Sequence, residues 1–208
     1  MKEKKRRTQF MRVAEELGLS FSKKSDRALR KRLKEFSRFA TRSGKHRYHA
    51  NIINVLRDNR FAGEMVFFEC WQRWGNSGTM DGVFYFRSPG MNWPQFSLRE
   101  MLAAKQLFLG AMTGNSGLKV EKHTKFSERY YLTSNDEKAA LELFDGKLVT
   151  SLESQEGFHI EAHRDEVIIY TANTEYRTVN YRPYKRIEPD ELEQLRSKAI
   201  DIFERFRS

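Results

Sequence analysis

The chain has 208 residues, of which 39% are hydrophobic and 32% are charged, so it has enough apolar material for one core of ordinary size. Its single cysteine excludes an internal disulfide and a zinc site built from cysteines, and it favours a reducing compartment. The sequence has no apolar run of about 18 residues, which argues against a membrane-spanning helix, and its start, MKEKKRRTQF, lacks the apolar stretch of a signal peptide. We therefore expect a cytoplasmic protein, which can also attach peripherally to a membrane.

The net charge of +10 is concentrated near the N-terminus. Up to residue 48 there are seventeen Lys and Arg against five Asp and Glu, a balance of +12, whereas the remainder has 21 against 23, a balance of −2. We therefore divide the chain into a basic helical arm, residues 1–48, and a single domain, residues 49–208. Such an asymmetry suggests a polyanionic partner, either nucleic acid or an anionic membrane surface, although a solvated helical face gives the same pattern.

The first predicted helix runs from Thr8 to Leu17. Apolar residues recur in it at helical spacing, and Gly18 can end it in the left-handed conformation. The next three residues, 19–21, are predicted to be extended.

A second helix is predicted from Ser25 or Asp26, either of which can cap it, to about Phe39. One side of this helix is apolar. Basic residues recur on the other sides at helical spacing, and we call this set the basic stripe: Arg27, Arg30, Lys31, Lys34 and Arg38. Cations opposite an apolar side suit the phosphate groups of lipid or nucleic acid, so the stripe is a candidate anion-binding site.

The most apolar part of the chain, residues 64–87, is predicted to be two strands joined by the turn Gly75–Gly78. Because side chains alternate along a strand, each strand has one continuous apolar surface, and we expect these two surfaces to form one wall of the core. The first surface has Val66, Phe68 and Cys70, and the second has Met80, Gly82, Phe84 and Phe86. Cys70 is accordingly interpreted as a buried apolar residue and not as a nucleophile.

Further strands are predicted at residues 51–56, 119–121 and 130–132, and a hairpin at residues 158–163 and 167–172. Two S-x-x-E patterns, beginning at Ser97 and Ser134, predict the starts of two helices. Residues 148–152 are ambiguous between strand and helix. The clearest amphipathic helix follows Pro189 and places Leu192, Leu195, Ala199, Ile202, Phe203 and Phe206 on one side.

Short hairpins outnumber long crossovers in this pattern, which predicts an α+β fold with a mainly antiparallel sheet and interspersed helices. We expect the C-terminal amphipathic helix to pack on the sheet.

Three residues of one predicted strand form a candidate metal site. His159, Glu161 and His163 alternate, so they point to one face, and imidazole and carboxylate are ligands of many zinc and iron sites. The first and third residues are about 13 Å apart on a regular strand, which is too far for one ion without a bulge. The alternative is the solvent-facing polar side of an amphipathic strand.

A second candidate surface interleaves tyrosine with arginine and lysine between Tyr176 and Arg186. Such a surface can stack bases and bind phosphates, or it can be an edge strand whose charges discourage pairing with another chain.

Three segments resemble an uncharacterised family of small bacterial proteins: AEELGLSF at 14–21, WPQFSLR at 93–99, and KFSERYYL at 125–132 followed by NDE at 135–137. Many members of that family carry a hydrophobic span ahead of the Gly-Leu-x-Phe segment, which implies a cytoplasmic domain held at a membrane. This sequence has MKEKKRR in place of the span. The resemblance assigns no catalytic residues to this sequence, and we expect no cofactor.

Three hypotheses on function remain open at this point. The favoured one is a non-enzymatic binding or scaffolding module whose body binds a protein or a small ligand, while residues 1–48 contact a membrane surface or nucleic acid. The second is a metal-dependent enzyme with a site near His159, Glu161 and His163. The third is an assembly protein that offers its C-terminal helix to a partner.

Overall fold

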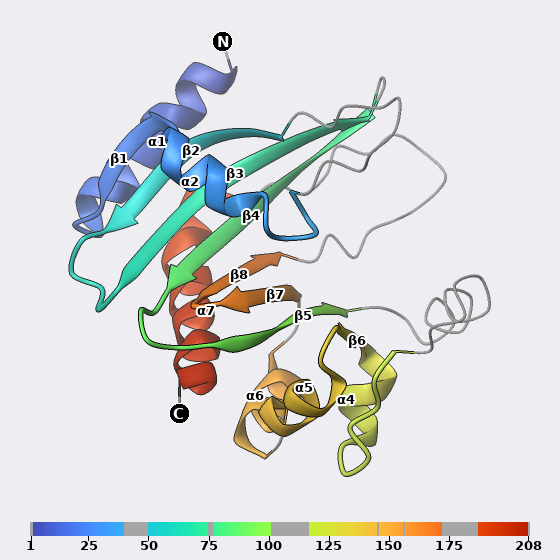
Figure 1. The fold of residues 1–208 in the computed structure, drawn as a ribbon. Helices are drawn as coiled ribbons and strands as arrows, with labels where there is room; N and C mark the ends of the chain where they lie inside the picture. The colour runs from blue at the N-terminus through green and yellow to red at the C-terminus, as the bar shows by residue number, and fades with distance from the viewer. Residues whose placement is uncertain are drawn as a thin grey trace.

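The computed structural model describes residues 2–39, 50–74, 77–100, 117–144, 146–155, 157–171 and 187–207. Its centre is one eight-stranded antiparallel sheet with the strand order β1-β2-β3-β4-β8-β7-β5-β6 (Figure 1). The strands are β1 Ser20–Lys24, β2 Ala50–Asp58, β3 Glu64–Trp74, β4 Ser77–Arg87, β5 Trp93–Glu100, β6 Tyr130–Ser134, β7 Phe158–Arg164 and β8 Glu166–Thr171. The helices are α1 Lys2–Glu16, α2 Arg27–Leu33, α4 Thr124–Arg129, α5 Glu137–Leu143, α6 Lys147–Ser154 and α7 Leu192–Arg207, with a 3-10 turn at Pro189–Glu191 before α7. The predicted α+β class is therefore confirmed.

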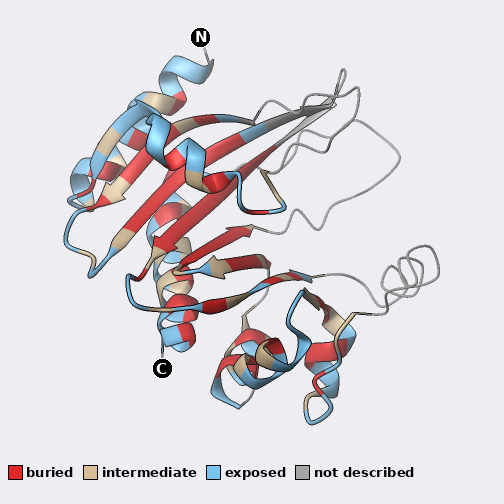
Figure 2. Ribbon diagram, viewed as in Figure 1, coloured by how far each residue is buried: buried red, intermediate tan, exposed pale blue. Residues whose placement is uncertain are grey.

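Helices cover both faces of this sheet, and Figure 1 shows α2 in front of the strands and α7 behind them. The α7 face carries the larger core, in which Phe203 of α7 stacks on Phe86 with ring centroids 4.5 Å apart. The α2 face carries a smaller core, to which α2 contributes Leu29 and Leu33. Because both faces are covered, the central strands are buried along most of their length (Figure 2).

The predicted hairpin exists, but its two apolar sets do not form one wall. Val66, Phe68 and Cys70 belong to the core of the α2 face, whereas Phe84 and Phe86 belong to the core of the α7 face. The reason is the register, which places Phe84 opposite Phe67 and not opposite Phe68. A shift of one residue in register moves a whole set of side chains to the other face.

The described N-terminal residues contribute to the sheet and to both cores. Strand β1 pairs with β2 and extends the sheet, and Phe10 and Ala14 of α1 are buried in the core of the α7 face. The predicted boundary at residue 48 lies outside the described residues. Among those that are described, residues 2–39 share both cores with the rest of the chain.

Several element boundaries differ from the sequence predictions. Residues 97–100 belong to strand β5 and do not begin a helix, since Phe96 and Leu98 alternate into the core while the strand pairs on both sides. The rest of that predicted helix lies outside the described residues. Helix α2 ends at Leu33, six residues before the predicted end, and turns follow. The second S-x-x-E pattern does precede a helix, but Asp136 caps it in place of Ser134.

The C-terminal helix is confirmed, and its apolar side is buried: Leu192, Ala199, Ile202, Phe203 and Phe206. The ambiguous segment at 148–152 is helix α6. Within the described ranges, no helix combines the length and apolar character that crossing a membrane requires.

Candidate functional site

The α2 face changes character along the sheet. Under α2 it is apolar, but on β7, β5 and β6 it is polar. Alternation along β5 buries Phe96 and Leu98 on the α7 face and therefore directs Ser97 and Arg99 to the α2 face. In the register of the sheet, Ser97 lies between Glu161 of β7 and Thr133 of β6.

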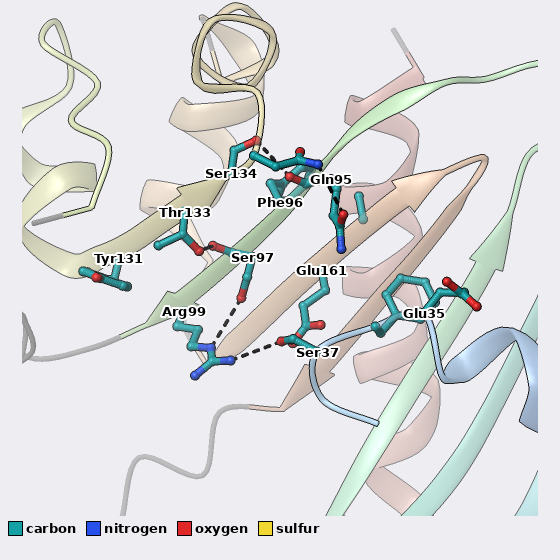
Figure 3. A pocket seen from close by; sticks show the side chains of 13 residues that line it. Glu35, Ser37, Gln95, Phe96, Ser97, Arg99, Tyr131, Thr133, Ser134 and Glu161 are labelled. Atoms are coloured by element: carbon teal, nitrogen blue, oxygen red, sulfur yellow. Dashed lines mark hydrogen bonds between the residues drawn. The ribbon is translucent and has the colours of Figure 1, made fainter. Parts of the chain in front are cut away.

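A cavity of about 500 Å³ lies over this polar region, between the sheet and the turn that follows α2 (Figure 3). Its lining combines hydroxyl and amide groups with one cation, Arg99, the carboxylates of Glu35 and Glu161, and the apolar ring of Phe36. This size and this mixture are typical of sites for small molecules.

The Glu161 carboxylate lies beside the cavity and is 2% exposed. Three donors satisfy it: the Ser37 hydroxyl at 2.9 Å, the Arg38 backbone N–H at 3.2 Å and the Tyr170 hydroxyl at 3.1 Å. Burial of Tyr170, together with the neighbouring Glu161 charge, raises the pKa of this tyrosine. Tyr170 therefore remains a neutral hydrogen-bond donor at ordinary pH.

A second tyrosine–carboxylate pair lies on the same face. The Tyr85 hydroxyl donates to Glu166 at 2.6 Å, and Arg32 of α2 lies 3.5 Å from the same Glu166 oxygen. Each tyrosine ring also carries an arginine above it, with Arg32 at 5.3 Å from the Tyr85 ring and Arg38 at 5.4 Å from the Tyr170 ring. These contacts hold α2 and the turn after it on the sheet.

Arg99 differs from these arginines because it makes no ion pair with the residues that the structure describes. Toward the described residues its guanidinium donates two long hydrogen bonds, to the Ser97 hydroxyl at 3.4 Å and to the Ser37 hydroxyl at 3.3 Å (Figure 3). The cavity therefore contains a cation whose remaining N–H groups can meet a ligand.

The structure gives the members of the candidate metal site separate partners. Nδ1 of His159 accepts the Glu100 backbone N–H at 3.0 Å, and the Glu161 carboxylate receives the three donors described above. His163 lies at the far end of β7, beside Glu166 of β8. Within the described ranges, no group of three His, Cys, Asp or Glu residues is placed to hold a metal ion. The geometry does not bring these residues together as the metal hypothesis requires, because they lie along an extended strand.

The basic stripe is only partly as predicted. The side chains of Arg27, Arg30, Lys31 and Lys34 are exposed, opposite the buried Leu29 and Leu33. Arg38 leaves the stripe because the chain turns after α2, and its guanidinium pairs with the buried Asp81. We call the first four residues the exposed stripe from here on. The tyrosine-rich surface at 176–186 lies outside the described residues.

On the opposite face, the buried Arg6 of α1 holds Glu69 of β3 through hydrogen bonds of 2.6 and 3.0 Å. Asn54 donates to the same carboxylate at 2.6 Å. Glu69 and Asp81 belong to neighbouring strands but lie on opposite faces, so they cannot act together as an acid–base pair.

Sequence reasoning missed the cavity, Ser97 and Arg99 because it assigned Ser97 to a helix cap. The signal that could have found them is the alternation of Gln95, Phe96, Ser97, Leu98 and Arg99, which has the period of a strand. The apolar side of α7, predicted as a surface for a partner, is covered by the sheet.

Comparison with known proteins gives a fold and no family. No family model matches the chain, and no curated protein matches its sequence. The crystal structure of the mycobacterial trehalose monomycolate transport factor A, TtfA, is similar to this structure with a TM-score of 0.56 and 14% sequence identity, over 96% of this chain and 94% of that chain. The two proteins therefore share an architecture across nearly their whole length.

Proposed function

We propose that this protein is a non-enzymatic binding module that contacts an anionic membrane surface through the exposed stripe. The observation that carries the proposal is the difference between the two sides of α2. One side of the helix is fixed to the sheet by Leu29, Leu33 and the ion pairs of Arg32, while the other side presents four exposed cations. A rigidly held helix can bring these charges to a flat surface together.

The exposed stripe suits a lipid membrane better than it suits nucleic acid. Proteins that bind single strands add exposed aromatic rings for base stacking. Near the stripe, the aromatic residues Phe36 and Phe39 pack in the core of the α2 face instead. The contact that remains is electrostatic, and each cation near an anionic membrane contributes about 1 kcal/mol.

TtfA is named a transport factor, so this fold occurs in at least one protein that is not named for a catalytic activity. The proposal needs no catalytic centre, and the buried carboxylates of the α2 face serve in it to fix α2 in place. A metal-dependent reaction at β7 has no comparable support from the geometry.

The test compares two variants of equal charge in co-sedimentation with vesicles of phosphatidylcholine and phosphatidylserine at low salt. The first variant changes all four residues of the exposed stripe to Glu. The control changes four exposed lysines near α4, α5 and α6 to Glu: Lys122, Lys125, Lys138 and Lys147. Loss of binding in the first variant alone supports the proposal, and equal binding by both variants contradicts it. If the wild type binds duplex or single-stranded DNA in preference to the vesicles, the partner of the exposed stripe is nucleic acid and not a membrane.

A further inference from the structure

We propose that the cavity over β5, β6 and β7 binds a small organic carboxylate, which pairs with Arg99. This site is separate from the exposed stripe and would act whether or not the protein contacts a membrane. It rests on the placement of hydrogen-bond donors around Arg99 and on the shape of the cavity (Figure 3).

Several hydrogen-bond donors of the cavity wall are available to a ligand. Arg99 uses two of its five N–H groups in long hydrogen bonds and has no carboxylate partner in the described part of the chain. The Ser97 hydroxyl accepts from Arg99, and none of the described residues accepts its hydrogen. The nearby Gln95 accepts through its amide oxygen from Asn135, and no residue in the described ranges accepts from the Gln95 amide N–H groups. A ligand that fits this wall is an acceptor of several hydrogen bonds.

Arg99 can pair with a single negative charge on a ligand. Arg99 is the one cation in the described lining, which also includes the carboxylates of Glu161 and Glu35. The Glu161 charge is satisfied by protein donors, so it does not need a ligand, but it disfavours a second negative charge beside it. A carboxylate matches the planar fork of one guanidinium, whereas a phosphate dianion would need further cations.

The rest of the cavity lining indicates what kind of molecule carries the carboxylate. The Phe36 ring provides an apolar part of the wall. A volume of about 500 Å³ exceeds what a bare inorganic ion fills and accommodates a small organic body. The ligand class is therefore a carboxylic acid with a compact, partly apolar body.

Benzoate is a suitable probe, benzamide is its neutral counterpart, and inorganic phosphate tests the other oxyanion. Titration of the full chain, followed by amide NMR shifts, should give saturable shifts at Ser37, Ser97 and Arg99 with benzoate, with a dissociation constant of roughly 1 mM or below. Benzamide should bind at least about tenfold more weakly, because it lacks the charge that Arg99 meets.

Two variants complete the test. Arg99→Gln should weaken benzoate binding by about tenfold or more, and Arg27→Gln, which changes an exposed arginine on α2, should leave it unchanged. Arg99 is exposed, so its replacement is expected to leave the fold intact, and the NMR spectrum checks this directly. The absence of saturable shifts, equal binding of benzamide, tighter binding of phosphate, or unchanged benzoate binding by Arg99→Gln would each overturn the proposal. Vesicle binding by Arg99→Gln reports separately on the exposed stripe.

Discussion

The Tyr170 hydroxyl donates a hydrogen bond to Oε1 of Glu161 across the neighbouring strands β8 and β7 at 3.1 Å. The Tyr85–Glu166 bond repeats this arrangement between β4 and β8. Both carboxylates also interact with α2 or the turn after it, through the Arg32 side chain and the Arg38 backbone N–H. The position of α2, and with it the exposed stripe and one wall of the cavity, therefore depends on two buried polar clusters.

Replacement of Tyr170 by Phe removes one of the three donors to a buried carboxylate. We expect a loss of about 1–3 kcal/mol in the free energy of unfolding, the usual effect of removing a hydrogen bond to a charged group. Urea denaturation measures it. A double-mutant cycle with Glu161→Leu, which removes the acceptor, isolates the pair, and a coupling energy near zero would show that the bond does not form in solution.

The ion pair between Arg6 and Glu69 holds α1 on the sheet, and both residues are buried, with exposed fractions of 8% and 1%. Arg6→Met leaves a buried carboxylate with Asn54 as its remaining described donor, which should reduce the free energy of unfolding by about 3–5 kcal/mol. Adding Glu69→Leu removes the unpaired charge and should restore much of that loss. If the double variant is no more stable than Arg6→Met, the loss comes from packing and not from the charge.

Burial raises the pKa of the Cys70 thiol to about 12. At pH 8 only about one thiol in ten thousand is then ionised, and the thiolate is the reactive form. A thiol reagent such as Ellman's reagent should therefore label the native protein very slowly and the guanidinium-unfolded protein at once. Rapid stoichiometric labelling of the native protein would contradict the burial of Cys70 in the core of the α2 face.

Asp58, at the end of β2, holds Arg196 of α7. Burial alone would raise the pKa of its carboxyl, but hydrogen bonds from Arg60 and Arg196 outweigh burial and hold this pKa below its ordinary value of 3.8. A carboxyl group whose pKa is lower in the folded than in the unfolded protein stabilises the fold at pH values above 3.8. This contribution is lost as the pH falls through the folded-state pKa.

Accordingly, the difference in unfolding free energy between the wild type and Asp58→Asn should be constant near neutral pH and shrink as the pH falls below 3.8. Denaturant melts at several pH values between 2 and 7 measure it. A difference that grows on acidification would contradict the lowered pKa.

Local patterns predicted much of the fold. The apolar spacing of Ile202, Phe203 and Phe206 identified α7, and alternation identified the β7–β8 hairpin, because both signals depend only on neighbours in sequence. The burial of Cys70 was predicted on the same basis and is confirmed.

Other features depend on contacts that are distant in sequence. The faces of Phe68 and Phe84 were not predictable from their own strands, since the register between the strands decides them. The path of Arg38 was missed because the turn after α2 directs it to Asp81, which lies 43 positions further along the chain. For Arg99, the strand alternation was visible in the sequence, but the cap-like Ser97 and Glu100 suggested a helix instead.

The most direct test of the proposed function is a salt titration of wild-type binding to vesicles with and without phosphatidylserine. We predict binding only to the anionic vesicles, and a steep decline as salt rises toward physiological strength and beyond, because exposed charges are screened over about 8–10 Å there. Absence of binding at low salt, or binding that is equal on neutral vesicles and independent of salt, would contradict the account and make the exposed stripe a solvated surface.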